Sequence, residues 1–182
     1  MESPTVRLTL SLLGCAVLAY IITLLPDAFY TPSVRPDLRG PLWLIHLIFL
    51  FIHEGGHFVF RPLGETMYLL GGSIMQVLAP GAWIAAALYE RSKLAALALF
   101  FTGYSLVDVS VYIKDAETHV LPLIGGRGTS HDWWTVLSRH DALDLAAPLG
   151  ETCFWLGMGA ALGATAWAVA LSVAAYREKA SG

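Results

Sequence analysis

Hydrophobic residues along this chain of 182 residues fall into five long runs, separated by polar connections. A helix needs about 20 apolar residues to cross the hydrocarbon core of a bilayer, and each run reaches or approaches that length. The pattern therefore predicts an all-α integral membrane protein with one transmembrane domain, residues 1–182. The five expected helices cover residues 8–25, 42–60, 67–89, 94–113 and 152–176.

The connections between the runs differ in length. Residues 61–66 and 90–93 form short links, which predict that the second, third and fourth helices are antiparallel neighbours. A long loop, residues 114–150, separates the fourth helix from the fifth. Within it, Thr129-Ser-His-Asp132 resembles a capping box and predicts a short helix near residues 131–140. The end of the second helix and this loop are expected at the same face of the membrane.

Composition and charge agree with a membrane protein. Hydrophobic residues make up 56% of the chain and charged residues 14%, and the mean hydropathy is +0.61. A net charge of −3 provides no basic field for nucleic acid. Strict alternation of five helices places Arg7 opposite the C-terminus and leaves the denser share of Lys and Arg beside it. The positive-inside rule then favours a cytoplasmic C-terminus in a multi-pass protein of a bacterial-type cell membrane.

One motif with metal-binding chemistry interrupts the uncharged second run. In His53-Glu-Gly-Gly-His57 the two histidines lie one helical turn apart on the same face. Their imidazoles can bind one Zn²⁺, and Glu54 between them can act as general base for the metal-bound water. Ionisable groups inside a membrane segment are costly unless they bind something. The alternative is a pair of core histidines held by their neighbours.

Catalytic zinc usually has three protein ligands, and three residues are candidates for the third position. Asp108 lies about one turn from the end of the fourth helix, at the expected depth of the histidine pair. It could instead be a hydrogen-bonded packing carboxyl. His131 and Asp132 lie in the long loop, where one could serve as a ligand or both could simply begin the short helix. The sequence leaves this choice open.

Other polar and small residues are expected near the same depth. Gly71, Gly72 and Gln76 are candidates for binding substrate, since glycine allows close approach of a backbone and Gln76 could hold it. The alternative for Gln76 is a hydrogen bond between helices. His46, two turns before His53, is expected to be a buried hydrogen-bonded histidine. Asp115 follows the fourth helix and is expected to be solvated.

In the fifth run, Gly159 and Gly163 have the spacing of a helix face that packs closely against another helix. This face is expected to help assemble the bundle.

With its motif on the second helix, the chain resembles the site-2 protease family of intramembrane zinc metalloproteases. In that family an aspartate from a later membrane helix completes the metal site. The matching residues here are His53, Glu54, His57 and Asp108, within residues 42–115. The chain departs from the family's Asn-Pro-x-Asp-Gly sequence, since it reads Ser-Leu-Val-Asp-Val around Asp108.

The resemblance implies a membrane-embedded zinc metalloprotease that hydrolyses peptide bonds of membrane or membrane-proximal substrates. Its partners would be the lipid bilayer and a membrane protein or peptide. Two other functions fit the residues. One is a metal-dependent hydrolase of a lipid or another amphiphile, and the other is a non-enzymatic metal-binding or transport protein of the membrane.

Overall fold

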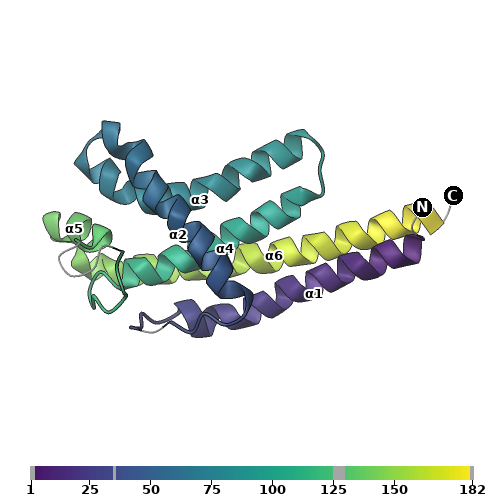
Figure 1. The fold of residues 1–182 in the computed structure, drawn as a ribbon, viewed down its shortest axis with the longest axis horizontal. Coiled ribbons are helices and arrows are strands. Elements are labelled where there is room, and N and C mark those ends of the chain that lie inside the picture. The colour runs from purple at the N-terminus through teal and green to yellow at the C-terminus, as the bar shows by residue number, and fades with distance from the viewer. Residues whose placement is uncertain (1–2, 35, 125–129, 181–182) are drawn as a thin grey trace.

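The computed structural model describes residues 3–34, 36–124 and 130–180, and these residues form helices joined by turns and loops (Figure 1). Five helices are long and apolar enough to cross a membrane, which confirms the predicted number. They are α1 (Pro4–Phe29), α2 (Pro41–Phe60), α3 (Glu65–Tyr89), α4 (Leu94–Lys114) and α6 (Ala146–Ala180). The short helix α5 (Asp132–Arg139) lies in the long loop, as predicted, and two 3-10 turns, η1 (Arg61–Leu63) and η2 (Leu143–Leu145), complete the fold.

The helix ends follow local capping chemistry. α1 starts four residues earlier than expected because the Ser3 side chain accepts a hydrogen bond from Val6 N, and Pro4 occupies the first turn, where a proline is tolerated. α6 likewise starts at Ala146 rather than 152, since Pro148 lies in its first turn, where its missing N–H breaks no helical hydrogen bond.

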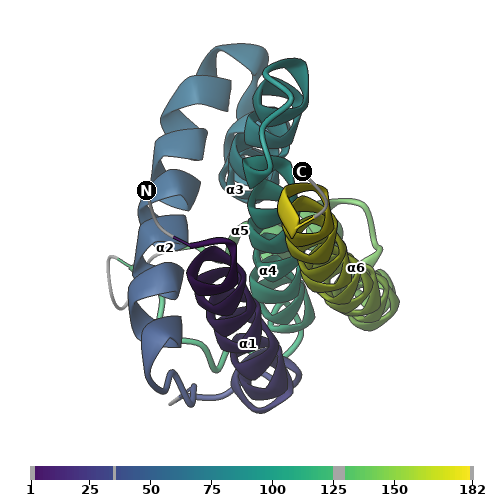
Figure 2. The ribbon, with the colours of Figure 1, turned by 90° about the vertical axis from the view of Figure 1, so that its right-hand side faces the viewer.

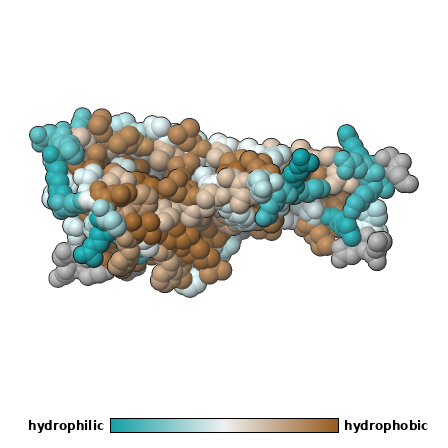
Figure 3. All heavy atoms as spheres, turned by 90° about the horizontal axis from the view of Figure 1, so that it is seen from above, coloured by the Kyte–Doolittle hydropathy of each residue, from teal (hydrophilic) through white to brown (hydrophobic). Residues whose placement is uncertain are grey.

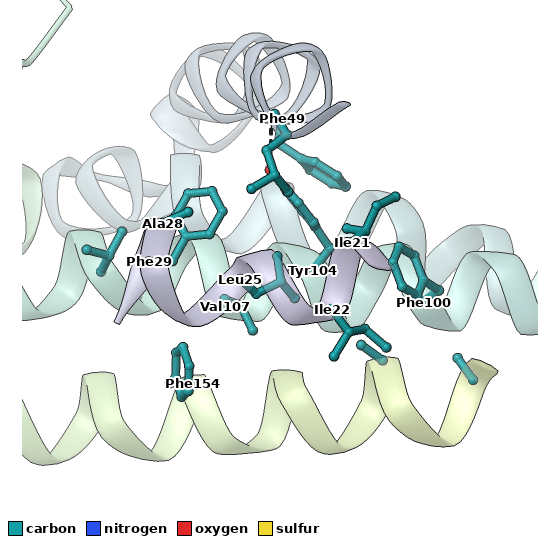
Figure 4. Packing of buried hydrophobic residues seen from close by; sticks show 14 residues of the cluster. Ile21, Ile22, Leu25, Ala28, Phe29, Phe49, Phe100, Tyr104, Val107 and Phe154 are labelled. Atoms are coloured by element: carbon teal, nitrogen blue, oxygen red, sulfur yellow. Dashed lines mark hydrogen bonds between the residues drawn. The ribbon is translucent and has the colours of Figure 1, made fainter. Parts of the chain in front are cut away.

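A continuous apolar core joins α1, α2, α4 and α6. It contains the fully buried side chains of Leu25, Phe29, Phe100, Tyr104 and Phe154 (Figure 4). On the face seen in Figure 3, apolar residues cover most of the middle of the molecule, and hydrophilic residues gather towards its two ends. This distribution is what a membrane-spanning bundle requires, with apolar side chains on both its inner and its outer faces.

α4 and α6 approach each other through small residues. A Cβ atom added to Gly103 would lie 2.6 Å from both Gly157 O and Ala161 N, so the two backbones are in direct contact. The expected close-packing pair Gly159 and Gly163 is not part of this interface, because a Cβ on either would meet nothing within 4 Å. The prediction of small-residue packing in this helix was right in kind, but it was placed on the wrong face.

α1 runs in the opposite direction to the one expected from strict alternation. Its first turns lie beside the end of α6 (Figures 1 and 2), where Arg7 shares a hollow with Lys93 and Lys179. Its other end lies beside the end of α4, where Lys114 Nζ donates to the Tyr30 carbonyl. Arg7 is therefore on the same side as the C-terminus, and the charge count that favoured a cytoplasmic C-terminus loses its basis.

The reason is the course of α2, which crosses the bundle obliquely (Figure 2). Near its start, Leu42 O accepts a hydrogen bond from Tyr104 OH at 3.3 Å, in the middle of α4. Three turns later the His53 ring contacts Tyr112, near the end of α4. The depth of a residue along α2 therefore cannot be read from helical rise alone.

Candidate metal centre

The two histidines of the motif lie on the buried face of α2, and α5 brings a carboxylate to them. His53 is 6% and His57 8% exposed. Asp132, the first residue of α5, places its Oδ2 3.5 Å from His53 Nε2 and 3.4 Å from His57 Nε2. Of the residues that the structure describes, these three form the one group of His, Cys, Asp or Glu whose ligand atoms all lie within 4.8 Å of one another.

Hydrogen bonds on the far side of each imidazole fix its tautomer. His57 Nδ1 lies 2.7 Å from the Tyr68 carbonyl oxygen, which can only accept, so Nδ1 carries the hydrogen. His53 Nδ1 lies 3.0 Å from Gln76 Oε1, and Gln76 Nε2 donates to Asp108 Oδ2 at 3.0 Å. Because the amide must present its NH₂ to the carboxylate, its oxygen faces His53, whose Nδ1 therefore also donates. With Nδ1 carrying a hydrogen, the neutral form of each imidazole presents a lone pair at Nε2.

The hydroxyl of Tyr112 fixes the carboxylate from the other side. Tyr112 OH donates to Asp132 Oδ2 at 2.9 Å and accepts a hydrogen bond from Asp132 N at 3.2 Å. Two imidazole lone pairs and one carboxylate oxygen therefore face one another. Three such electron-pair donors repel unless a cation, either a proton or a metal ion, lies among them.

The spacing of these donor atoms suits zinc. Ligand atoms about 2.1 Å from a tetrahedral zinc lie about 3.4 Å apart. The two separations that involve Asp132 Oδ2, 3.5 and 3.4 Å, match this value. Two histidines and one carboxylate are also a common ligand set of catalytic zinc, which leaves a fourth position for water. The residues present therefore fit a zinc ion.

Asp108, the family-like candidate, has a different place. Its carboxylate accepts hydrogen bonds from Gln76 and from His46 Nδ1, the latter at 3.0 Å to Oδ1 and 3.1 Å to Oδ2. A hydrogen-bonded chain of side chains thus runs from the buried His53, Gln76 and Asp108 to the partly exposed His46. Because α2 is oblique, His46 reaches Asp108 instead of lying far below it. The expected hydrogen bond of His46 is confirmed, but its side chain is 30% exposed and not buried. The alternative of Gln76 as a link between helices is also confirmed.

His131, the remaining candidate, caps α5. Its Nδ1 accepts from Trp134 N at 3.3 Å, and its Nε2 lies 3.4 Å from Asp115 Oδ2, which is long for a hydrogen bond. His131 therefore points away from the motif, although its neighbour Asp132 points towards it.

Asp115 is not solvated, contrary to expectation. Its side chain is fully buried and accepts hydrogen bonds from Thr118 Oγ1 and from the backbone N–H groups of Val120 and Leu121. Burial by itself would raise the pKa of the Asp115 carboxyl, but His131 and these three donors together lower it below its ordinary value. Asp115 organises the turn after α4, which leads the chain into the loop that carries Asp132.

Two further contacts, one from a tryptophan and one from an arginine, also dock α5 on α3. Trp133 Nε1 donates to Ser73 Oγ at 3.0 Å, and Arg139 forms an exposed ion pair of 2.8 Å with Glu65. The exposed ion pair contributes little, typically below about 1 kcal/mol. The partly buried bond from Trp133 holds α5 at the depth of the motif.

The glycines of α3 provide space for α2. A Cβ on Gly72 would lie 2.4 Å from His53 Nε2, and a Cβ on Gly56 would lie 2.3 Å from the Gly71 carbonyl oxygen. Gly71 and Gly72 thus face α2, and neither lines the cavity at the motif, whereas Gln76 does. Their proposed contact with substrate stays a prediction.

A cavity of about 240 Å³ opens beside the histidine pair. Its polar lining includes His53, His57 and Asp132, and its apolar lining comes from helices and from residues 121–124 of the loop. Glu54 also lines it and is partly buried. Within the described residues Glu54 has no hydrogen bond or ion pair, so its carboxylate is available to a molecule in the cavity.

Sequence reasoning missed three residues of this centre. Tyr112 follows Asp108 by one helical turn, a spacing that places both on one face of α4. That periodicity was the available signal. Ser73 directly follows the two glycines, at the depth expected for the histidine pair, but no pattern pointed to its contact with Trp133. Tyr68 takes part through its backbone carbonyl, which no sequence pattern reveals. No family model, curated protein or solved structure matches this chain.

Proposed function

We propose that this protein is a membrane-embedded zinc metallopeptidase, in which His53, His57 and Asp132 hold the metal. The observation that carries the proposal is the convergence of Nε2, Nε2 and Oδ2, with both tautomers fixed so that lone pairs face the carboxylate. The three donors need a cation among them, and because their spacing suits zinc, a metal ion is the cation that we propose. The resemblance of the motif to the site-2 protease family supports the same function, with Asp132 in place of the family's aspartate.

Bound zinc would polarise a carbonyl group and lower the pKa of its water to about 7. Glu54 lines the same cavity and has no partner among the described residues, so it can accept a proton there. The same carboxyl can return the proton to a leaving amine. Gln76, Tyr68 and Tyr112 keep the three ligands oriented and do not themselves move protons.

The cavity supports a peptide segment as substrate. Its volume of about 240 Å³ is just below the range of roughly 300–1,000 Å³ for pockets that bury a drug-sized ligand. It would enclose a scissile bond with its neighbouring side chains, but not a whole helix. The apolar lining from Leu50, Leu69 and Val109 favours uncharged side chains, as in a membrane or membrane-proximal segment.

The test uses the purified full chain in lipid nanodiscs, loaded with one equivalent of Zn²⁺, with labelled membrane peptides and labelled phospholipids as substrates. We expect peptide cleavage by the wild type. Glu54→Gln should retain zinc and lose about 10²–10⁴-fold in rate, because it removes the general base. Glu90→Gln, an exposed carboxyl at the α3–α4 turn, is the matched control and should cleave normally.

Full activity of Glu54→Gln would overturn the mechanism. Cleavage of phospholipid alone would replace the peptidase by a lipid hydrolase. Stoichiometric zinc binding without hydrolysis of either substrate would leave a metal-binding or transport protein.

A further inference from the structure

We infer that Tyr112 is the positioning residue that makes Asp132 the third ligand of the metal site. The inference rests on the proposed zinc site and adds a residue that the motif does not contain. It concerns how a carboxylate from outside the long helices is held against two histidines inside them.

Tyr112 contacts Asp132 through both of its hydrogen-bonding functions. Its hydroxyl donates to Oδ2 at 2.9 Å, and Oδ2 is the same atom that lies nearest to the two histidine Nε2 atoms. The hydroxyl oxygen also accepts from Asp132 N at 3.2 Å. One side chain of α4 therefore fixes the backbone and the carboxylate of the first residue of α5 together.

The ring of Tyr112 is itself held on two sides. It stacks on His131 with ring centroids 4.4 Å apart and meets the His53 ring edge-on at 5.5 Å. Tyr112 thus touches one proposed ligand, His53, and also His131, the residue before the proposed ligand Asp132. Because α4 packs against α1, α3 and α6, the hydroxyl is attached to a rigid part of the bundle.

Other contacts of α5 do not replace this one. α5 has eight residues, and isolated helices of that length are unstable in water, so its position depends on docking. The bond from Trp133 to Ser73 and the ion pair from Arg139 to Glu65 hold the helix, but neither reaches the Asp132 carboxylate. Within the described residues, Tyr112 is the hydrogen-bond donor to Asp132 Oδ2. Without it, the carboxylate could rotate away from the histidines while α5 stayed docked.

Groups that orient a metal ligand typically change metal affinity by about 10–100-fold when removed. Tyr112→Phe deletes only the hydroxyl and keeps the ring that packs on His53 and His131. We therefore expect Co²⁺, titrated into the metal-free full chain and followed by its visible absorption, to bind about 10–100-fold more weakly in this variant.

Tyr104→Phe is the matched control. Tyr104 lies on the same helix, is fully buried, and donates its hydroxyl hydrogen bond to Leu42 O, away from the metal centre. It should lower stability without changing Co²⁺ affinity. Equal weakening by Tyr104→Phe, or wild-type affinity in Tyr112→Phe, would overturn the inference.

A double-mutant cycle with Asp132→Ala separates positioning from a general structural effect. If Tyr112 acts through Asp132, then Tyr112→Phe should cause no further loss of Co²⁺ affinity once Asp132 is alanine. The same further loss in both backgrounds would overturn the inference, and the cycle reads this out even if Tyr112→Phe is less stable.

Two results would reject the proposed zinc site itself. One is a wild type that lacks a single tight Co²⁺ site, and the other is a His57→Ala variant that binds Co²⁺ as tightly as the wild type. A wild type that binds tightly and a His57→Ala variant that does not would confirm the site, and the role of Tyr112 is then decided by the cycle.

Discussion

The α4–α6 interface and the contact of α5 with the bundle use opposite kinds of interaction. α4 and α6 meet backbone to backbone at Gly103 and Gly157, with buried alanines continuing the contact. α5 is held by directed hydrogen bonds from Tyr112 and Trp133. The α4–α6 interface has no room for an added atom, and it contains no residue of the proposed site. The hydrogen bonds of α5 leave more room for substitution, and they determine where Asp132 lies. Stability and function are therefore separable by mutation.

The largest expected effect is on the functional side. Asp132→Ala removes one of the three proposed ligands. If a zinc site contributes about 10 kcal/mol, a third of it is about 3 kcal/mol, which corresponds to at least about 100-fold weaker binding. Calorimetric zinc titration measures this, and circular dichroism of the metal-free protein should show that the helical fold is retained.

Asp144→Ala provides the control for that variant. It removes an exposed carboxyl in the same long loop and should bind zinc normally. Equal losses in the two variants would mean that Asp132 acts through charge in the loop and not as a ligand.

The second effect is on the structural side. Gly103→Ala places a Cβ 2.6 Å from Gly157 O and Ala161 N, which are backbone atoms and cannot move aside easily. We expect a loss of about 1–3 kcal/mol in the free energy of unfolding, measured by circular dichroism in detergent. Zinc affinity of the folded protein should be unchanged, which would sharpen the separation of the two regions.

Gly159→Ala tests the same substitution on the open face of α6. Nothing lies within 4 Å of the new Cβ, so the change should be neutral or stabilising by about 0.5–1 kcal/mol. If Gly159→Ala destabilised the protein as much as Gly103→Ala, the contact between α4 and α6 would not be the cause.

The smallest effect tests the link between the two regions. Asp108→Asn disturbs the chain from His46 through Gln76 to His53, which belongs to the core but orients a ligand. A loss of about tenfold in zinc affinity is expected, at the low end for groups that orient a ligand. A loss as large as that of Asp132→Ala would instead make Asp108 the third ligand, as the resemblance implied.

Much of the fold was predictable because it depends on patterns that are local in the sequence. The five apolar runs predicted five helices, and the short helix predicted near residues 131–140 corresponds to α5. Its cap is His131, whereas Thr129 of the expected capping box lies outside the described residues. Helix packing was not local. Gly157 and Gly159 differ by two positions, and only the rotation of α6 against α4 decides which of them is buried.

The candidate site divides in the same way. The sequence alone determined that His53, Glu54 and His57 share a helical turn, because the period of the α-helix fixes that geometry. The sequence also limited the candidates for the third metal ligand to three residues. The choice of Asp132 was made only by the tertiary structure: α2 crosses obliquely, so that Asp108 meets His46 and Gln76, and α5 docks so that Asp132 meets both histidines. The relative tilt of two helices and the docking of a loop depend on contacts between distant residues, which hydrophobic periodicity does not encode.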